Sequence, residues 1–297
     1  MSSRANTIEL LSPAKVNLML SVQGPREDGF HELTSIVVAL DFGDWLRVAV
    51  ADQSSDSLAC EHPDVPTGSE NLILQAAERF RAETGTSHFF DFELQKRIPM
   101  GAGLGGGSSN ATNALKAMNA LAETRLSNSE LSDLAAELGS DCPFFVDAKP
   151  ALMRGRGEVI EPLEAALADA LKGQRIVLFQ PDFAVNTRWA YKQLRENAPQ
   201  SYEAASLALE RFEQFAADKV ITGLLYNSFE AIVTKKYAGL ACLLEELRGN
   251  GIDCLMSGSG SCCFAIVNGS DSSLEALRGV CENAFGSSVF WVDSHIS

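Results

Sequence analysis

The residues best suited to chemistry lie in a glycine-rich segment that begins at Pro99. Five of the seven residues from 101 to 107 are glycine, and Ser108 and Ser109 follow them directly. A helical pattern starts at about Ser109 and continues to Glu123. Free amides and the dipole at a helix N-terminus attract anions, and glycine lets the backbone approach a ligand closely. The segment therefore predicts a loop that binds a polyphosphate.

Other kinds of glycine segment fit these residues poorly. Gly101, Gly103 and Gly106 satisfy the dinucleotide fingerprint, but that fold needs a strand after the helix, and here a second helical pattern follows. A Walker A loop needs a lysine where this chain has Ser108. The other sequence motifs of protein kinases are absent. The helix that follows at once also disfavours a flexible linker.

Two charged residues elsewhere are candidates for proton and charge transfer. Asp141 lies just after the second helical pattern, in a segment that ends at Pro143. Its carboxylate is suited to accept a proton from an alcohol, although aspartate also fixes turns of this kind. Lys15 precedes an alternating strand pattern, where a lysine either stabilises developing negative charge or is merely solvated. The residue types alone leave both alternatives open.

The elements that must position these residues mix strand pairs with helix pairs, which indicates an α+β fold. Residues 8–22 are predicted as an extended segment broken by Pro13, and residues 52–69 as a polar surface loop. Further strands are expected at 36–40, 45–50, 89–94, 175–180, 254–267 (around a glycine turn) and 288–292, and further helices at 71–83, 129–138, 187–197, 203–217, 237–250 and 273–285.

Composition excludes several classes of partner. The net charge is 24 − 39 = −15, so nucleic acid and anionic membrane surfaces would be repelled. The seven cysteines are scattered without a CxxC pair, which indicates free thiols in a reducing compartment rather than a zinc site. The N-terminus shows no signal-peptide pattern, and no apolar run reaches the ~20 residues of a membrane span. We expect a cytoplasmic protein, and nothing here specifies its oligomeric state.

Several segments resemble the motifs of the GHMP kinase family. The glycine segment from Pro99 to Ser109 resembles the family's second motif, the loop that wraps the triphosphate. The other segments are 13–18, 28–33, 69–72, 155–158 and 258–262, and they occur in the family's order along most of the chain. The Asp28-Gly-Phe-His31 segment is similar to those family members whose substrate carries a cytidine diphosphate group.

The resemblance implies a two-domain architecture and a reaction. Residues 1–160 would form the N-terminal domain, similar to domain 2 of ribosomal protein S5 and containing the ATP-binding glycine loop, and residues 161–297 a ferredoxin-like C-terminal domain. The reaction would be ATP- and Mg²⁺-dependent phosphorylation of the 2-hydroxyl of a methylerythritol that carries a cytidine diphosphate group, in the non-mevalonate route to isoprenoid precursors. Another GHMP small-molecule kinase, of the homoserine or mevalonate type, and a non-catalytic ligand sensor are the alternatives.

The resemblance also implies roles for single residues. Asp141 would be the base and Lys15 its electrostatic partner, with Ser108 or Ser109 helping to hold Mg²⁺. Phe30 stands where the family usually has tyrosine, so stacking on cytosine is kept while any hydroxyl contact is lost. The implied ATP-binding residues are Asn71, Lys96, Pro99, Met100, Gly101, Ala102, Gly103, Leu104, Gly105, Gly106, Gly107, Ser108 and Ser109, and the implied substrate-binding residues are Asn17, Phe30, His31 and Thr187.

Overall fold

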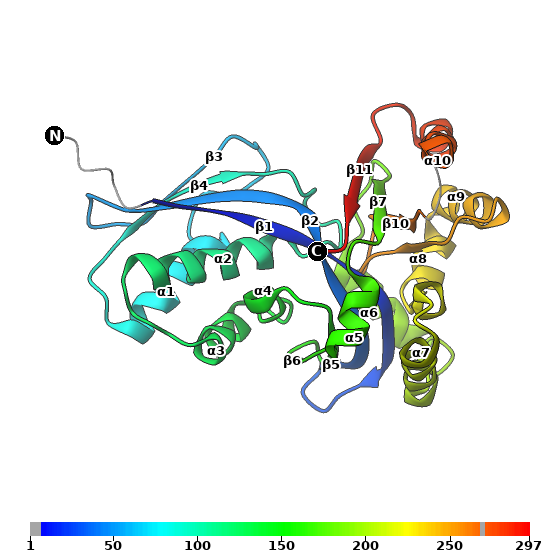
Figure 1. Ribbon diagram of the computed structural model, residues 1–297, viewed down its shortest axis with the longest axis horizontal. Coiled ribbons are helices and arrows are strands. Elements are labelled where there is room, and N and C mark those ends of the chain that lie inside the picture. Colours follow the sequence, from blue (N-terminus) through cyan, green and yellow to red (C-terminus); the bar gives the residue numbers. More distant parts are fainter. Residues whose placement is uncertain (1–6, 268–270) are drawn as a thin grey trace. The chain divides into compact units, whose positions relative to one another are not determined.

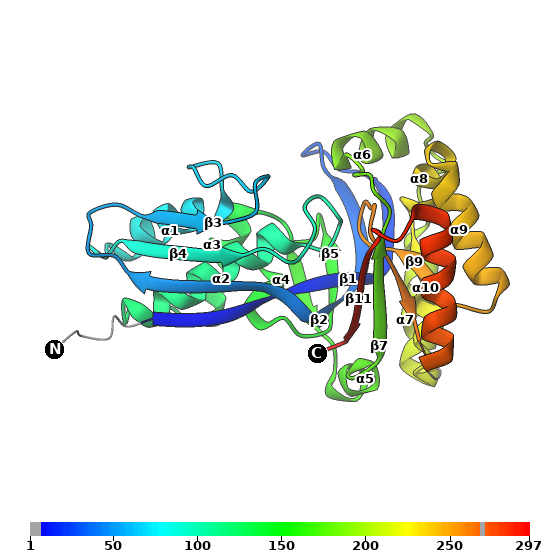
Figure 2. The same ribbon diagram turned by 90° about the horizontal axis from the view of Figure 1, so that it is seen from above.

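The computed structural model describes residues 7–267 and 271–297 (Figures 1 and 2). The chain forms two compact units, and each unit is assembled from separate segments of sequence. Unit 1 contains Gly43–Met100, Gly105–Ala148 and the described residues up to Ala14. Unit 2 contains Lys15–Phe42, Gly101–Leu104 and the described residues from Lys149 onward. The expected division at residue 160 stays a prediction about functional domains.

Two long strands, β1 (Thr7–Pro25) and β2 (His31–Val50), contribute residues to both units. Pro13 does not break β1, so that expectation is wrong. The register of β1 with β8 (Tyr226–Asn227) involves only Met19 and Leu20, so the first half of β1 lies at the sheet edge. A proline is tolerated there because its missing N–H removes no ladder bond on the open side.

In unit 1, β2 pairs antiparallel with β4 (Phe90–Gln95), and β4 pairs parallel with β3 (Ser57–Cys60). The four residues of β3 lie inside the segment predicted as a loop, because so short a strand leaves little periodicity to detect. The helices α1 (Leu72–Thr84), α2 (Gly106–Leu121), α3 (Asn128–Leu138) and α4 (Phe144–Asp147) cover one face of this sheet (Figure 1).

The core of unit 1 follows from the two periodicities of its elements. Phe90, Phe92 and Leu94 alternate along β4 and are buried, while α2 buries residues at helical spacing, among them Leu115 and Met118. These side chains belong to one hydrophobic cluster. The packing fixes the orientation of α2 and therefore the direction in which its N-terminus points.

Unit 2 is built on an antiparallel sheet in the order β11-β7-β10-β9. Its strands are β7 (Arg175–Gln180), β9 (Cys254–Met256), β10 (Cys263–Ile266) and β11 (Phe290–His295). The helices α8 (Glu230–Lys236), α9 (Ala238–Gly249) and α10 (Asp271–Phe285) lie along one face of it (Figure 2). The remaining helices are α5 (Ala165–Leu171), α6 (Thr187–Glu196), α7 (Ala205–Asp218) and the 3-10 turn η1 (Ile221–Leu224).

The part of β2 that belongs to unit 2 pairs with β5 (Ala151–Gly155), and β5 pairs with β6 (Val159–Pro162). The α+β class is confirmed, as are the expected helices at 187–197 and 237–250 and the two strands around the glycine turn. Over residues 7–267 and 271–297, no helix is both long enough and apolar enough to cross a membrane.

Candidate active site

The glycine loop has the backbone that its sequence predicts. Gly101, Gly103 and Gly105 have φ angles of 64°, 80° and 70°, in the region that side chains other than glycine rarely adopt. Gly105 is the N-cap of α2, which begins three residues earlier than the sequence indicated. The first amides of α2 have no acceptor inside the helix, because no carbonyl precedes them by four residues within it. The loop therefore ends in a backbone anion site.

A buried carboxylate, which the sequence did not reveal, anchors the base of this loop in unit 1. Asp44 is fully buried and accepts hydrogen bonds from Lys96 Nζ at 2.5 Å and from Asn110 Nδ2 at 3.0 Å. It also accepts the backbone N–H groups of residues 97 and 98, both at 2.7 Å. Burial lowers the pKa of Lys96, and the charge of Asp44 opposes that shift. Asp44, in the interior of β2, thus joins that strand to the chain after β4 and to the start of α2.

Lys96, predicted to bind ATP, lies against the first turn of α2. A Cβ added at Gly106 would come within 2.9 Å of Lys96 Nζ, so glycine at this position makes room for the ammonium group. Lys96 also lines a cavity of about 780 Å³ on unit 1, together with Trp45, Cys60 and His62. The positive charge of Lys96 therefore lies both at the helix N-terminus and at the wall of a cavity.

The first two turns of α2 lie close to the Asp141 segment in unit 1. The Thr112 hydroxyl donates to the Cys142 carbonyl at 2.8 Å, and the Ser108 side chain lies near enough to the Cys142 thiol to affect its pKa. Asp141, the residue before Cys142, is half-buried. Burial raises the pKa of the Cys142 thiol to about 11, so this group is neutral at physiological pH. The structure thus brings the predicted base beside the first turns of the predicted phosphate-binding helix.

The first half of the glycine loop packs against the second glycine motif, Gly258–Cys262, within unit 2. A Cβ at Gly103 would lie 2.3 Å from the Ser257 carbonyl oxygen, and the Ser257 hydroxyl donates to the Gly103 carbonyl at 3.3 Å. The Cys262 amide donates to the Ala102 carbonyl at 3.2 Å. Thr187 joins the same turn, because its hydroxyl is 2.7 Å from that of Ser259. Two motifs separated by more than a hundred residues therefore form one structure.

Lys15 and Asn17 form the start of a buried polar chain in unit 2. The Lys15 ammonium donates to Asn17 Oδ1 at 2.6 Å, and Asn17 Nδ2 donates to the Ser35 hydroxyl at 2.8 Å. Ser35 in turn donates to the Met19 carbonyl at 2.6 Å. Lys15 and Asn17 are each only 5% exposed. The lysine is therefore no solvated surface residue, and the orientation of the Asn17 amide is set by its two partners.

Two tyrosines, Tyr191 and Tyr202, lie against the His31 imidazole, and the sequence pattern did not indicate either contact. His31 Nε2 is 3.2 Å from the Tyr202 hydroxyl, and the imidazole centroid lies 4.9 Å from that of Tyr191. Burial lowers the pKa of His31 from its ordinary 6.5, and the charge of Arg195 acts in the same direction. His31 is therefore mainly a neutral imidazole at pH 7, with one ring nitrogen that donates a hydrogen bond and one that accepts.

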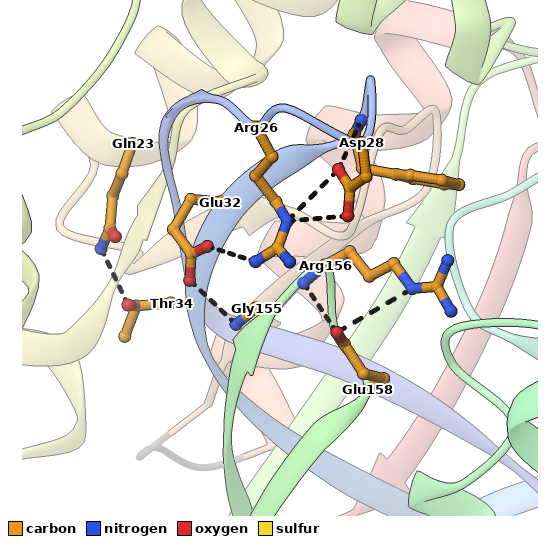
Figure 3. A network of polar contacts seen from close by, with 9 residues as sticks. Gln23, Arg26, Asp28, Glu32, Thr34, Gly155, Arg156 and Glu158 are labelled. Carbon is orange, nitrogen blue, oxygen red and sulfur yellow. Dashed lines mark hydrogen bonds and ion pairs between the residues drawn. The ribbon is translucent and has the colours of Figure 1, made fainter.

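Phe30 differs from its neighbour in being 47% exposed. The guanidinium carbon of Arg156 lies 4.9 Å from the centroid of its ring. Arg156 belongs to the loop after β5, which joins the Phe30 loop through a polar network that includes Arg26 and Glu32 (Figure 3). Both loops lie in segments that resemble family motifs, but no local sequence pattern indicates that they touch.

Other predicted ATP-binding residues have simple structural settings. The Asn71 side chain caps α1 by accepting the Ile73 amide at 2.9 Å, and it donates to the Pro66 carbonyl at 2.7 Å. Met100 is exposed, whereas the loop residues Ala102 and Leu104 are buried. No group of three or more His, Cys, Asp or Glu side chains suited to a metal occurs among the residues that the structure describes.

Comparison with known proteins agrees with this arrangement. Residues 71–149 match the GHMP kinases N terminal domain, and residues 204–285 match the GHMP kinases C terminal region. The chain belongs to the GHMP kinase family, and it is an ATP-dependent small-molecule kinase. The two-domain α+β architecture expected from the motifs is thereby confirmed.

Within that family, the chain is similar to 4-diphosphocytidyl-2-C-methyl-D-erythritol kinases. It is 36% identical to the one from Alcanivorax borkumensis over 278 residues, which cover 92% of this chain and 86% of that protein. The chloroplastic enzyme of Arabidopsis thaliana is 35% identical over 264 residues, 87% of this chain and 67% of its own. A crystal structure of 4-(cytidine 5'-diphospho)-2C-methyl-D-erythritol kinase matches with a TM-score of 0.78 and 34% identity, and the match covers 98% of this chain and 100% of that one.

Proposed function

We propose that this chain transfers the γ-phosphate of ATP to the 2-hydroxyl of 4-diphosphocytidyl-2-C-methyl-D-erythritol. The observation that carries the proposal is the hydrogen bond from Thr112 of α2 to the carbonyl of Cys142, the residue that follows Asp141. The relatives bearing that name, and the His31 environment suited to an uncharged base, support the substrate. The product serves the non-mevalonate route to isoprenoid precursors.

The proposed chemistry assigns one task to each group. Asp141 accepts the proton of the 2-hydroxyl as its oxygen forms a bond to the γ-phosphorus, and the bond to the β-phosphate oxygen breaks to release ADP. Lys15 supplies positive charge to the developing alkoxide, and the first amides of α2 stabilise charge on the transferring phosphate. Direct in-line transfer of this kind needs no covalent enzyme intermediate.

Magnesium fits the residues at the start of α2. Ser109 Oγ is fully buried and has no hydrogen-bond partner among the described residues, so an oxygen ligand is available there. When bound, Mg²⁺ neutralises phosphate charge, and ATP oxygens would supply most of its ligands because the described part of the chain holds no acidic cluster. Ser109 would hold the ion, with Ser108 beside it.

The remaining sites follow the same assignment. Asn17, Phe30, His31 and Thr187 bind the acceptor. Asn71, Lys96, Met100 and the 780 Å³ cavity next to Lys96 receive the nucleotide base, while Pro99 and Gly101–Gly107 wrap its phosphates. We also propose domains at 1–160 and 161–297, in keeping with family matches that fall on either side of residue 160. A cytoplasmic location is in keeping with seven free cysteines.

A coupled assay of ADP release tests the proposal. Wild type, Asp141→Asn and Lys15→Ala are assayed with Mg-ATP and the cytidyl substrate, and Asp133→Asn, an exposed carboxylate on α3, is the matched control. We expect turnover in wild type and the control, and losses of roughly 10²–10⁴-fold in the other two. Homoserine and mevalonate run in parallel as acceptors. Turnover with one of these acceptors alone would overturn the proposed substrate. ATP binding without turnover of any acceptor would favour the alternative of a non-catalytic ligand sensor.

A further inference from the structure

Phe30 lies at the tip of the loop between β1 and β2, and the loop is shaped to present its ring. The Arg26 amide donates to the Phe30 carbonyl at 2.8 Å, and the Phe30 amide donates to Asp28 Oδ1 at 3.1 Å. Gly29 has a φ of 85°, which permits the tight turn. These bonds use the backbone of Phe30 and leave nearly half of the residue exposed. An exposed aromatic ring on a fixed backbone is suited to stacking on a planar ligand.

Arg156 lies on a second loop, which is also held by its own backbone. The Arg156 amide donates to Glu158 Oε2 at 2.7 Å, and a Cβ at Gly155 would lie 2.7 Å from that same oxygen. The ion pair from Arg156 Nε to Glu158 Oε1 is long, at 3.9 Å, and partly exposed, so it contributes little to stability. The loop thus keeps its shape without the Arg156 guanidinium, which is directed instead to the ring of Phe30.

A third set of contacts holds the two loops together (Figure 3). The Arg26 guanidinium pairs with Glu32 at 2.6 Å and with Asp28 at 3.1 Å. Glu32 accepts the Gly155 amide at 3.1 Å through its other oxygen. The β1–β2 loop and the β5–β6 loop therefore form one connected structure, and the distance between Arg156 and Phe30 is a consequence of it.

We propose that Arg156 is a positioning residue for base recognition, covering one face of Phe30 so that the other face receives the pyrimidine of the substrate. This inference rests on the function proposed above and deepens it. A guanidinium is planar and prefers aromatic faces, so it holds the ring while leaving the opposite face accessible. Phenylalanine has no hydroxyl by which a partner could orient the ring. The Arg156 stack supplies that orientation from the other side.

The test compares wild type with Arg156→Gln, Phe30→Leu and the double variant. Loss of an exposed cation–π contact predicts a KM for the cytidyl substrate raised roughly fivefold in Arg156→Gln, with kcat and the KM for ATP unchanged. In the Phe30→Leu background, Arg156→Gln should have no further effect, because the arginine acts through the ring. Arg154→Gln is the matched control, since Arg154 is exposed on the same hairpin and pairs with Glu161 at 3.3 Å.

Calorimetric titration with cytidine 5'-diphosphate repeats the comparison of wild type, the two single variants and the double variant as a binding measurement that does not depend on turnover. The same fivefold loss of affinity, absent in the Phe30→Leu background, supports the inference even if the acceptor proposed above is wrong. Wild-type behaviour of Arg156→Gln overturns it. So does an equal loss in both backgrounds, which would mean that the arginine contacts the ligand phosphates directly. A parallel fall in kcat and melting temperature would show that its role is structural and would also overturn it.

Discussion

At the scale of single residues, the site depends on buried polar side chains that are held by one another. Lys15 donates a hydrogen bond to Asn17, Asn17 donates one to Ser35, and Ser35 donates one to a backbone carbonyl. Each buried polar atom in such a chain is costly to leave unpaired, so the loss of one member disturbs the next. The side chains proposed to meet the substrate are then positioned by residues that do not touch it.

Ser35→Ala should therefore damage the site without touching substrate. The change leaves Asn17 Nδ2 without its acceptor, at a cost of about 1–3 kcal/mol in the free energy of unfolding. It should also lower kcat, because Asn17 and Lys15 lose their fixed orientation. Ser21→Ala is the control, since the Ser21 hydroxyl is equally buried but has no partner among the described residues. Denaturant unfolding and steady-state kinetics on both variants test the prediction. Equal losses of stability and of kcat in Ser35→Ala and Ser21→Ala would contradict it.

His31 should make stability depend on pH in a defined direction. Its folded-state pKa lies below the 6.5 of the unfolded chain, chiefly because of burial. Between the folded-state and unfolded-state pKa values of His31, the unfolded chain binds more protons than the folded protein. The stability that the neutral His31 contributes is therefore fully present above about pH 6.5 and is lost as the pH falls below it. The slope for one group cannot exceed about 1.4 kcal/mol per pH unit.

Denaturant unfolding from pH 7.5 down to 5.5 measures this contribution. His31→Gln should remove part of the pH dependence, whereas His88→Gln, at an exposed position, should follow wild type. The KM for the cytidyl substrate should rise over the same interval in wild type, because a protonated imidazole no longer accepts a hydrogen bond. A pH profile that is identical in wild type and His31→Gln would refute the assignment.

At the scale of elements, the decisive feature is the meeting of two glycine motifs. Gly103 and Gly258 approach so closely that a Cβ on Gly103 would meet a backbone oxygen at 2.3 Å, and one on Gly258 would meet another at 2.9 Å. Backbone atoms cannot move aside as a flexible side chain can. Glycine at these positions is therefore required by close approach as well as by its φ angle.

Two glycines of the loop separate these requirements. Gly101 and Gly103 have similar left-handed φ angles, but the space around Gly101 is open within 4 Å. Gly101→Ala should cost only the conformational penalty, of roughly 1 kcal/mol. Gly103→Ala should cost several-fold more and should weaken ATP binding at least tenfold, because the loop must separate from the Ser257 turn. Melting temperatures and ATP titrations compare the two, and an effect of Gly101→Ala as large as that of Gly103→Ala would argue against the packing explanation.

The same elements show what the sequence could and could not reveal. The run of glycines and the helical periodicity after it are local signals, and they predicted the loop and α2 to within three residues. Asp44 lies between the strands expected at 36–40 and 45–50, which form one strand, and it accepts four hydrogen bonds from residues 52 to 66 positions away. Tyr202 and Arg156 likewise act through partners on other elements. Such partnerships depend on tertiary structure, which no single-sequence periodicity encodes.

At the scale of the whole molecule, the two compact units interleave in sequence. Unit 2 takes Lys15–Phe42 from the first part of the chain and most of its residues from the last part. Leu20, Val22 and Leu33 belong to its hydrophobic cluster together with residues of β7 and α9. A division of function at residue 160 would therefore not be a division into independently folding pieces.

The interleaving makes a prediction about fragments. A fragment of residues 161–297 lacks β1, whose Met19 and Leu20 pair with β8, and it lacks the three apolar side chains that complete its core. It also loses Asp41, which accepts the Ser294 hydroxyl at 2.5 Å. We expect this fragment alone to show no cooperative thermal unfolding, because the free energy lost with several buried apolar side chains exceeds the usual stability of a domain.

Co-expression with residues 1–160 should restore a cooperative transition and ADP release, since the missing strands are supplied in trans. Calorimetry on the fragment and on the co-expressed pair distinguishes the cases: a sharp transition in the isolated fragment would mean that the C-terminal part folds without the strands it shares with the first forty-two residues.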